Sequence, residues 1–140
     1  MSSEKETEDD GKFGLFSAPD GPDKLYTFNR NSEFRSEFRI EVNRMWENFK
    51  PICPDRHFES EFQKQFLARL WEIHLGNAFL DNRLKLNQPP RNGPDIQIVT
   101  PSIWVEAISV TSGQGENRVF ELPAGQAGQF PEDEIILRLA

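Results

Sequence analysis

The segment from Asn92 to Ser112, NGPDIQIVTPSIWVEAISVTS, constrains the fold more than any other because it has the pattern of a β-hairpin. Ile96 and Ile98 alternate with Asp95, Gln97 and Val99; after a turn at Thr100-Pro101-Ser102, Ile103, Val105 and Ala107 alternate with Trp104, Glu106 and Ile108. Period-two alternation rich in β-branched residues, between Gly-Pro and Pro-Ser, is typical of strands. The segment is therefore predicted to form two antiparallel strands.

Two acidic residues interrupt the apolar pattern of this hairpin: Asp95 opens the first strand, and Glu106 lies within the second. A turn near Pro101 places them opposite each other or one diagonal step apart, with Cβ atoms ~5 Å or ~7 Å apart. Carboxylates that close repel unless a proton or a hard divalent cation lies between them. In the alternative interpretation one acid caps a turn and the other faces solvent, and a slip of one residue would put them on opposite faces.

A helix is predicted from Ser32 to Phe49, where apolar residues recur every three or four positions. Its apolar stripe is Phe34, Phe38, Val42, Met45 and Phe49; its predicted solvated face carries Glu33, Arg35, Glu37, Arg39, Glu41 and Arg44. Asn31 or Ser32 can cap its start, and Pro51 ends it.

A second and longer helix is predicted from about His57 to about Leu80, with Asp55 as its N-cap. Its main stripe is Phe62, Phe66, Leu70 and Ile73, and apolar residues on nearly every side predict a buried helix. Glu72 lies in an apolar sector with Ala68 and Phe79. A carboxylate there needs a partner or a raised pKa. An ion pair with Arg69 or a nearby lysine is the structural alternative to a functional role.

The 140 residues fit a single domain. Residues 1–30 are predicted to be an acidic tail and an irregular arm, and residues 31–140 a single domain. Arg83 to Asn87 is a possible short strand, and Ser112 to Gly128 a long loop. A helix is predicted to start at Pro131. Because the chain stops soon after, we expect the domain to be incomplete at its C-terminus.

The composition narrows the classes of function. The chain contains no run of about 18 apolar residues, so no membrane span is predicted. The single Cys53 fits a reducing compartment, so we expect a cytoplasmic protein in which Cys53 is a buried structural thiol. The net charge of −7 and the lack of a basic stripe argue against a dedicated nucleic-acid-binding module.

The order of elements resembles the first part of the PD-(D/E)xK, or restriction-endonuclease-like, nuclease superfamily. A helix bearing Glu72 precedes a short strand, then a strand opened by Pro94-Asp95, then a strand bearing Trp104-Val105-Glu106. The match covers roughly residues 58–140, through a short motif. The resemblance implies an α/β fold of α+β-like type, in which N-terminal helices accompany a small mixed sheet of restriction-endonuclease-like type. The resemblance also implies that the domain is truncated at the second core helix.

The resemblance also implies a reaction, the hydrolysis of phosphodiester bonds in DNA or RNA. Asp95, Glu106 and the backbone carbonyl of Ala107 would ligate Mg²⁺ or Mn²⁺, and Glu72 would be the additional helix acid found in part of the superfamily. The catalytic residues would therefore be Glu72, Asp95 and Glu106. The superfamily includes dimeric enzymes, so a homodimer is one possible assembly.

One position departs from the superfamily pattern. Its lysine corresponds to position 108, where this chain has Ile108, so Lys85 or a residue of the final helix would have to supply the charge. The alternative function is a catalytically inactive, nuclease-like interaction domain that binds a protein partner through Phe13, Phe16 or Phe28. A nucleic-acid-binding accessory module without chemistry is the third hypothesis.

Overall fold

The computed structural model describes residues 10–109 and residue 116. The predicted helix start at Pro131, and the predicted loop from Ser112 to Gly128 apart from residue 116, lie outside the described residues. Residues 10–109 belong to one compact unit.

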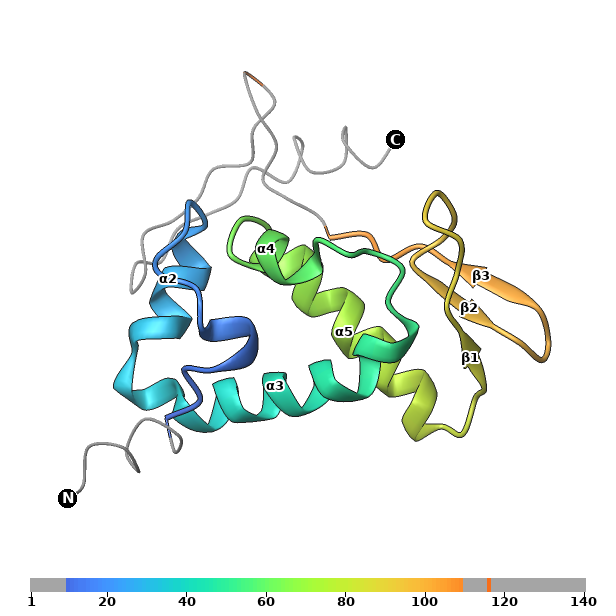
Figure 1. Cartoon of the computed structure of the whole chain (residues 1–140), viewed down its shortest axis with the longest axis horizontal. Coiled ribbons are helices and arrows are strands. Elements are labelled where there is room, and N and C mark those ends of the chain that lie inside the picture. Colours follow the sequence, from blue (N-terminus) through green and yellow to red (C-terminus); the bar gives the residue numbers. More distant parts are fainter. Residues whose placement is uncertain (1–9, 110–115, 117–140) are drawn as a thin grey trace. The chain divides into compact units, whose positions relative to one another are not determined.

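Helices come first in the described chain, and a small antiparallel sheet follows them (Figure 1). The α-helices are α2 (Lys24–Asn31), α3 (Ser36–Phe49), α4 (Phe58–Phe62) and α5 (Phe66–Asp81), joined by the 3₁₀ turns η1 (Gly14–Phe16), η2 (Glu33–Arg35) and η3 (Lys50–Ile52). The strands are β1 (Leu86–Asn87), β2 (Ile96–Ile98) and β3 (Ile103–Val105). This composition confirms the coarse prediction of a mixed α+β class. No helix among the described residues is both long and apolar enough to cross a membrane.

The sheet has the order β1-β2-β3, with both pairs of neighbours antiparallel. The predicted hairpin is confirmed, since Ile96 pairs with Val105 and Ile98 with Ile103 across a turn at residues 99–102. Both isoleucines of β2 are buried, whereas Ile103 and Trp104 of β3 are exposed. The sheet therefore buries β2 and leaves β3 as an exposed edge strand.

The long helix predicted from His57 to Leu80 is interrupted between Phe62 and Phe66. At the break, the backbone N–H of Phe66 donates to Oδ2 of Asp23 (2.9 Å), and the N–H of Asp23 donates to the carbonyl of Gln63 (3.3 Å). Oδ1 of Asp23 also accepts from the N–H of Leu25 in the first turn of α2. One aspartate thus caps α2 and the start of α5, a long-range interaction that helical periodicity cannot reveal.

The first predicted helix begins later than expected, and two of its side chains have the opposite environment from the prediction. Phe34, predicted in the apolar stripe, is 94% exposed because it lies in η2 before the α-helix starts. Arg39, predicted on the solvated face, is only 1% exposed. Its guanidinium donates to the backbone carbonyls of Asp10, Asn29 and Ser32 at 2.6–2.8 Å. These acceptors stabilise a charge that would otherwise be costly to bury.

The N-terminal arm is more ordered than predicted, because residues of the 1–30 segment enter the core. Leu15, Phe16 and Tyr26 are buried, and the Phe16 ring packs edge-on against Phe62 with centroids 5.3 Å apart. The amide of Asn43 on α3 donates to the carbonyls of Gly11 and Phe13, which fastens the arm to this helix. The arm is therefore part of the same hydrophobic core as α3 and α5.

Helix α3 packs against α5, and the sheet lies beside α5 on the side away from α2 (Figure 1). Gly76 of α5 lies against the ring of Phe49, which occupies the space where a Cβ at position 76 would lie. This contact brings the C-terminal end of α3 onto the half of α5 that follows Glu72.

Candidate functional site

The two hairpin acids lie at the same end of the β2–β3 pair. Ile96 and Val105 form the last pair of the ladder, so Asp95 and Glu106 are the next residues facing each other in the register. Asp95 is half-buried and Glu106 is exposed. Oδ2 of Asp95 accepts a hydrogen bond from the backbone N–H of Ala107 at 2.8 Å. The expected register is therefore present. In the contact between Ala107 and Asp95, the backbone N–H of Ala107 is the donor.

Glu72 on α5 is the buried acid of the site, with 7% of its surface exposed. Burial raises the pKa of Glu72 to about 7; the charge of Arg69 opposes this shift, and the charges of Asp95, Asp55 and Glu106 add to it. The charges of Asp95 and Glu106, the other two acids predicted from the sequence, thus reach Glu72. Their repulsion of an ionised Glu72 is one that a bound cation would relieve.

Arg69 links Glu72 to a fourth acid. Its Nη1 lies 3.3 Å from Oε1 of Glu72 and 3.0 Å from Oδ2 of Asp55. The guanidinium also lies over the Phe58 ring, 5.3 Å from the centroid. The structural alternative for Glu72, an ion pair with Arg69, is confirmed. The Asp55 contact was missed because Asp55 was predicted only as a cap, and its Oδ1 does accept from the N–H of His57 at 2.8 Å.

A polar cleft of about 380 Å³ opens beside these residues. It is formed by the segment at residues 54–57, by Arg69 of α5 and by the loop at residues 91–95. The charged side chains in its lining are Asp55, Arg56, Arg69, Arg91 and Asp95. The arginines were missed by sequence reasoning, because they are 13 to 35 positions apart and only the fold gathers them.

A preformed metal cage is not present in the described part of the chain. No group of three or more His, Cys, Asp or Glu side chains among these residues has the spacing to hold an ion. Asp95 and Glu106 are the carboxylates at the next facing positions after the last pair of the β2–β3 ladder, where cross-strand side chains lie close together. The roles predicted for Asp95, Glu106 and Ala107 as ligands remain predictions.

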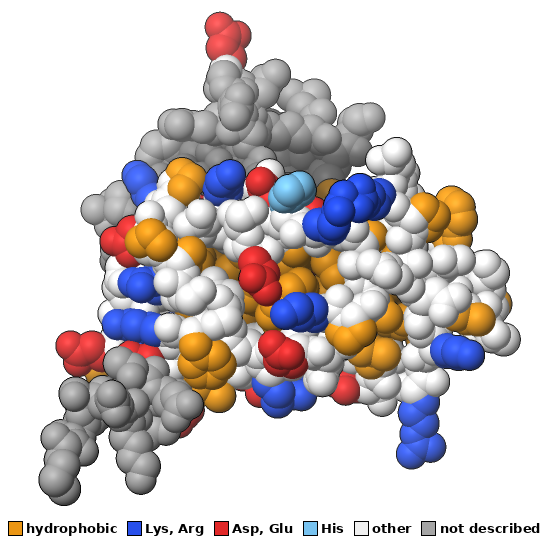
Figure 2. Space-filling view, viewed as in Figure 1, with side chains coloured by type: hydrophobic (Ala, Val, Ile, Leu, Met, Phe, Trp, Pro, Cys, Tyr) orange, Lys and Arg blue, Asp and Glu red, His pale blue; other side chains and the backbone are white. Residues whose placement is uncertain are grey.

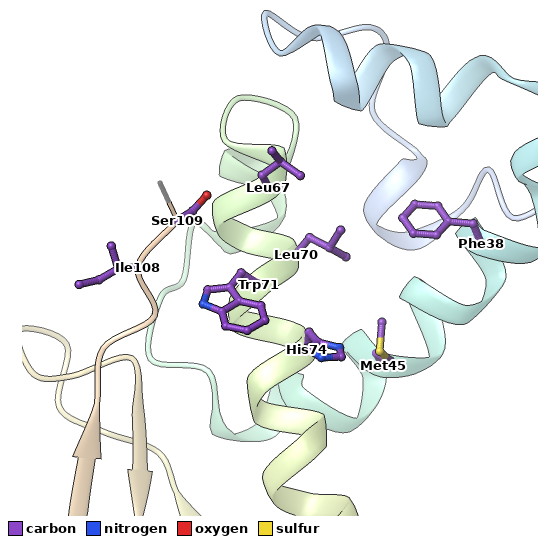
Figure 3. Close-up of a pocket in the computed structure, with 8 residues that line it drawn as sticks. All are labelled: Phe38, Met45, Leu67, Leu70, Trp71, His74, Ile108 and Ser109. Carbon is purple, nitrogen blue, oxygen red and sulfur yellow. The ribbon is translucent and has the colours of Figure 1, made fainter. Parts of the chain in front are cut away.

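A second, apolar hollow of about 500 Å³ lies between α3, α5 and the segment after β3 (Figure 3). Phe38 and Met45 line it from α3, Leu67 and Trp71 from α5. Ile108, which the sequence resemblance aligned with a lysine of the superfamily, also lines this hollow and is 75% exposed. In the described structure, position 108 therefore contributes an apolar side chain to an apolar surface.

Cys53 has the environment predicted for a buried structural thiol. The thiol is buried, and burial raises its pKa to about 11, so it is neutral and unreactive near neutral pH. His57 and His74 are exposed, and His74 stacks on Trp71 with ring centroids 5.6 Å apart. Of these three residues, only His57 lines the polar cleft.

Comparison of the chain with protein-family models, with curated proteins and with solved structures finds no match. A function is therefore inferred from the chain's own residues and their geometry. The informative features are the facing hairpin acids, the buried Glu72 and the arginine-lined cleft.

Proposed function

We propose that this chain is a nuclease-like domain of the PD-(D/E)xK type, which hydrolyses phosphodiester bonds of DNA or RNA with the help of Mg²⁺ or Mn²⁺. One observation carries the proposal above the others: the β2–β3 register brings Asp95 and Glu106 to facing positions, within electrostatic range of the buried Glu72. The order of α5, β1, β2 and β3 is the order of the corresponding elements in that superfamily. The restriction-endonuclease-like type of the fold is part of the same proposal.

The chemistry of the donors fits a hard divalent cation, which prefers carboxylate and carbonyl oxygens. Asp95 and Glu106 would hold the ion from opposite strands, together with the carbonyl oxygen of Ala107. The hydrogen bond from the Ala107 amide would fix the orientation of the Asp95 carboxylate. A bound Mg²⁺ would supply an activated water and would stabilise the charge on the phosphate. Glu72 would act from α5 as the third acid.

Calorimetry on the 140-residue chain tests the cation site. We expect Mn²⁺ or Mg²⁺ to bind the parent and to bind Asp95→Asn and Glu106→Gln at least about tenfold more weakly, because each variant loses one charged ligand. Glu47→Gln is the matched control, since Glu47 is an exposed acid of α3. Equal affinities in the parent and in all three variants would contradict the proposed site.

Cleavage of plasmid DNA and of a labelled RNA in the presence of each ion tests the reaction. Glu106→Gln removes a charge at nearly constant volume from an exposed position, so its circular dichroism spectrum and thermal midpoint should match those of the parent. We expect this folded variant to lose cleavage. Cleavage that persists in Glu106→Gln would assign the activity to other residues or to a contaminant.

The second candidate function is a catalytically inactive, nuclease-like domain that binds a protein partner. Two observations favour it: Ile108 replaces the lysine of the superfamily and lines an apolar hollow, and Phe13 and Phe28 are exposed. The prediction that Phe16 also contacts a partner is wrong, because this side chain is fully buried. This candidate predicts that neither ion binds. A homodimer would serve either candidate, and sedimentation of the intact chain would detect it.

A further inference from the structure

Two tight turns line the polar cleft, and each presents an arginine. In the first, the N–H of Phe58 donates to the carbonyl of Asp55 at 3.4 Å, which places Arg56 and His57 at the tip. In the second, the N–H of Gly93 donates to the carbonyl of Pro90 at 2.9 Å, which places Arg91 and Asn92 at the tip. Arg56, His57, Arg91 and Asn92 all line the cleft.

The arginines of the cleft differ in how their charges are compensated. Arg69 is engaged by Asp55 and Glu72. Arg56 and Arg91 are exposed and form no ion pair or side-chain hydrogen bond with any described residue. Lys and Arg side chains are also seen to gather beside a histidine on one face of the molecule (Figure 2). The cleft therefore holds two guanidinium groups that pair with no described side chain, in a chain whose net charge is −7.

A guanidinium is planar and donates two parallel N–H groups, so it suits the oxygens of a phosphate. The side-chain amide of Asn92 and the imidazole of His57 add further donors on the same two turns. A cleft of about 380 Å³ that opens to solvent has room for a phosphate with its sugar, whereas the apolar hollow at Trp71 offers such a group few donors.

We propose that Arg56 and Arg91 bind a backbone phosphate of a nucleic-acid strand in this cleft. Asp95 lines the cleft and also faces Glu106 in the hairpin, so the bound phosphate would lie next to the proposed cation site. The identification of the strand as the substrate rests on the proposed nuclease function. The phosphate site itself depends only on the two turns and their arginines.

Fluorescence anisotropy with a fluorescein-labelled DNA oligonucleotide, single-stranded and as a duplex, tests this site. EDTA is present throughout, so that the result does not depend on the proposed cation site. We expect Arg56→Ala/Arg91→Ala to lower the affinity roughly tenfold and to reduce the salt slope by about one, because one phosphate of the strand loses both of its guanidinium partners. Lys24→Ala/Arg83→Ala is the matched control, since it removes two exposed positive charges from outside the cleft lining.

Competition with inorganic phosphate distinguishes two possible ligands of the cleft, the phosphate of a nucleic-acid strand and free phosphate. If the cleft recognises the phosphate groups of a strand, phosphate displaces the oligonucleotide more effectively than chloride at the same ionic strength. Binding of inorganic phosphate to the parent without any binding of the oligonucleotide would overturn the assignment to nucleic acid. Equal losses in the cleft variant and in the control variant would overturn the site, because the attraction would then be a property of the overall charge.

The outcomes of this experiment and of the cation titration are independent. Oligonucleotide binding that requires Arg56 and Arg91, in a protein that binds neither Mg²⁺ nor Mn²⁺, would support the phosphate site and contradict the nuclease. Cation binding that requires Asp95, in a protein that binds no oligonucleotide, would support the metal site and overturn the phosphate site. Glu106→Gln should bind the oligonucleotide at least as tightly as the parent, since it removes a negative charge near the cleft.

Discussion

Arg69 and Glu72 form an ion pair across one turn of α5, with Nη1 of the arginine 3.3 Å from Oε1 of the carboxylate. Both side chains are largely buried, and the same Nη1 lies 3.0 Å from Asp55. One guanidinium group therefore pairs with two carboxylates, while Asp95 and Glu106 add further negative charge nearby. Burial of the carboxyl group is the main reason why the pKa of Glu72 is raised although the residue has a basic partner, and the neighbouring negative charges add to the shift.

Glu72→Gln should change the pH dependence of stability. The pKa of Glu72 is about 7 in the folded protein and 4.5 in the unfolded chain, so the folded protein holds a proton that the unfolded chain releases in that window. The free energy of unfolding of the parent therefore decreases as pH rises from 4.5 to about 7.

The glutamine variant cannot ionise, so it should lack this decrease and be more stable than the parent above pH 7 by roughly 1 to 3 kcal/mol. Urea denaturation across this pH range measures the effect, with Glu47→Gln as the control. Parallel pH profiles for the parent and Glu72→Gln would show that the folded state does not perturb Glu72.

Arg69→Met should destabilise the fold by about 3 kcal/mol, because it leaves the Glu72 and Asp55 carboxylates without their shared partner. Methionine keeps much of the packing against Phe58. Adding Glu72→Gln should recover part of the loss, and a double-mutant cycle by urea denaturation measures the coupling. Additive effects of the two substitutions would show that the ion pair contributes little.

The local pattern of the sequence predicted the hairpin well, because alternation and turn residues determine which residues pair. Ile96 and Val105 pair as that pattern indicated, so Asp95 and Glu106 take the next facing positions of the register. Glu72 was also identifiable, since a carboxylate in an apolar helical sector conflicts with its surroundings. Periodicity therefore found the three acids of the candidate site.

Long-range contacts explain what the sequence did not show. Arg39 looked like a surface residue because its acceptors are backbone carbonyls 7 to 29 residues away, and backbone groups carry no sequence signal. The break before α5 depends on Asp23, which is 43 residues from Phe66. Arg56 and Arg91 belong to separate turns that only the fold brings to one cleft.

Arg39→Met should be among the most destabilising single substitutions in the chain, with a loss of roughly 3 kcal/mol or more. Three carbonyl groups, from Asp10, Asn29 and Ser32, would lose their charged donor, and two of them fasten the N-terminal segment to α3. Arg39→Lys keeps the charge with fewer donors and should recover part of the loss. Thermal unfolding compares the two variants, and Arg35→Met is a control at an exposed position. Equal midpoints for Arg35→Met and Arg39→Met would contradict the assigned role.

Asp23→Ala should cost about 2 kcal/mol, more than the usual loss of a single cap, because it removes acceptors from the first turns of both α2 and α5. Asp23→Asn keeps one acceptor oxygen and should lie between the alanine variant and the parent. Hydrogen exchange at the amides of Leu25 and Phe66 reports on the two caps separately. Faster exchange at Leu25 alone would show that Asp23 does not stabilise the start of α5.

Two substitutions at Asp95 separate its structural role from its charge. Asp95→Ala removes the acceptor for the N–H of Ala107 and should destabilise the hairpin end by about 1 kcal/mol. Asp95→Asn retains an acceptor oxygen and should cost less. Both variants remove a charge that raises the pKa of Glu72, so the pH-dependent loss of stability should move to lower pH in both. Urea denaturation as a function of pH measures both effects. If the pH profile stays in place in both variants, Asp95 and Glu72 are not coupled, and the central premise of a shared acidic site fails.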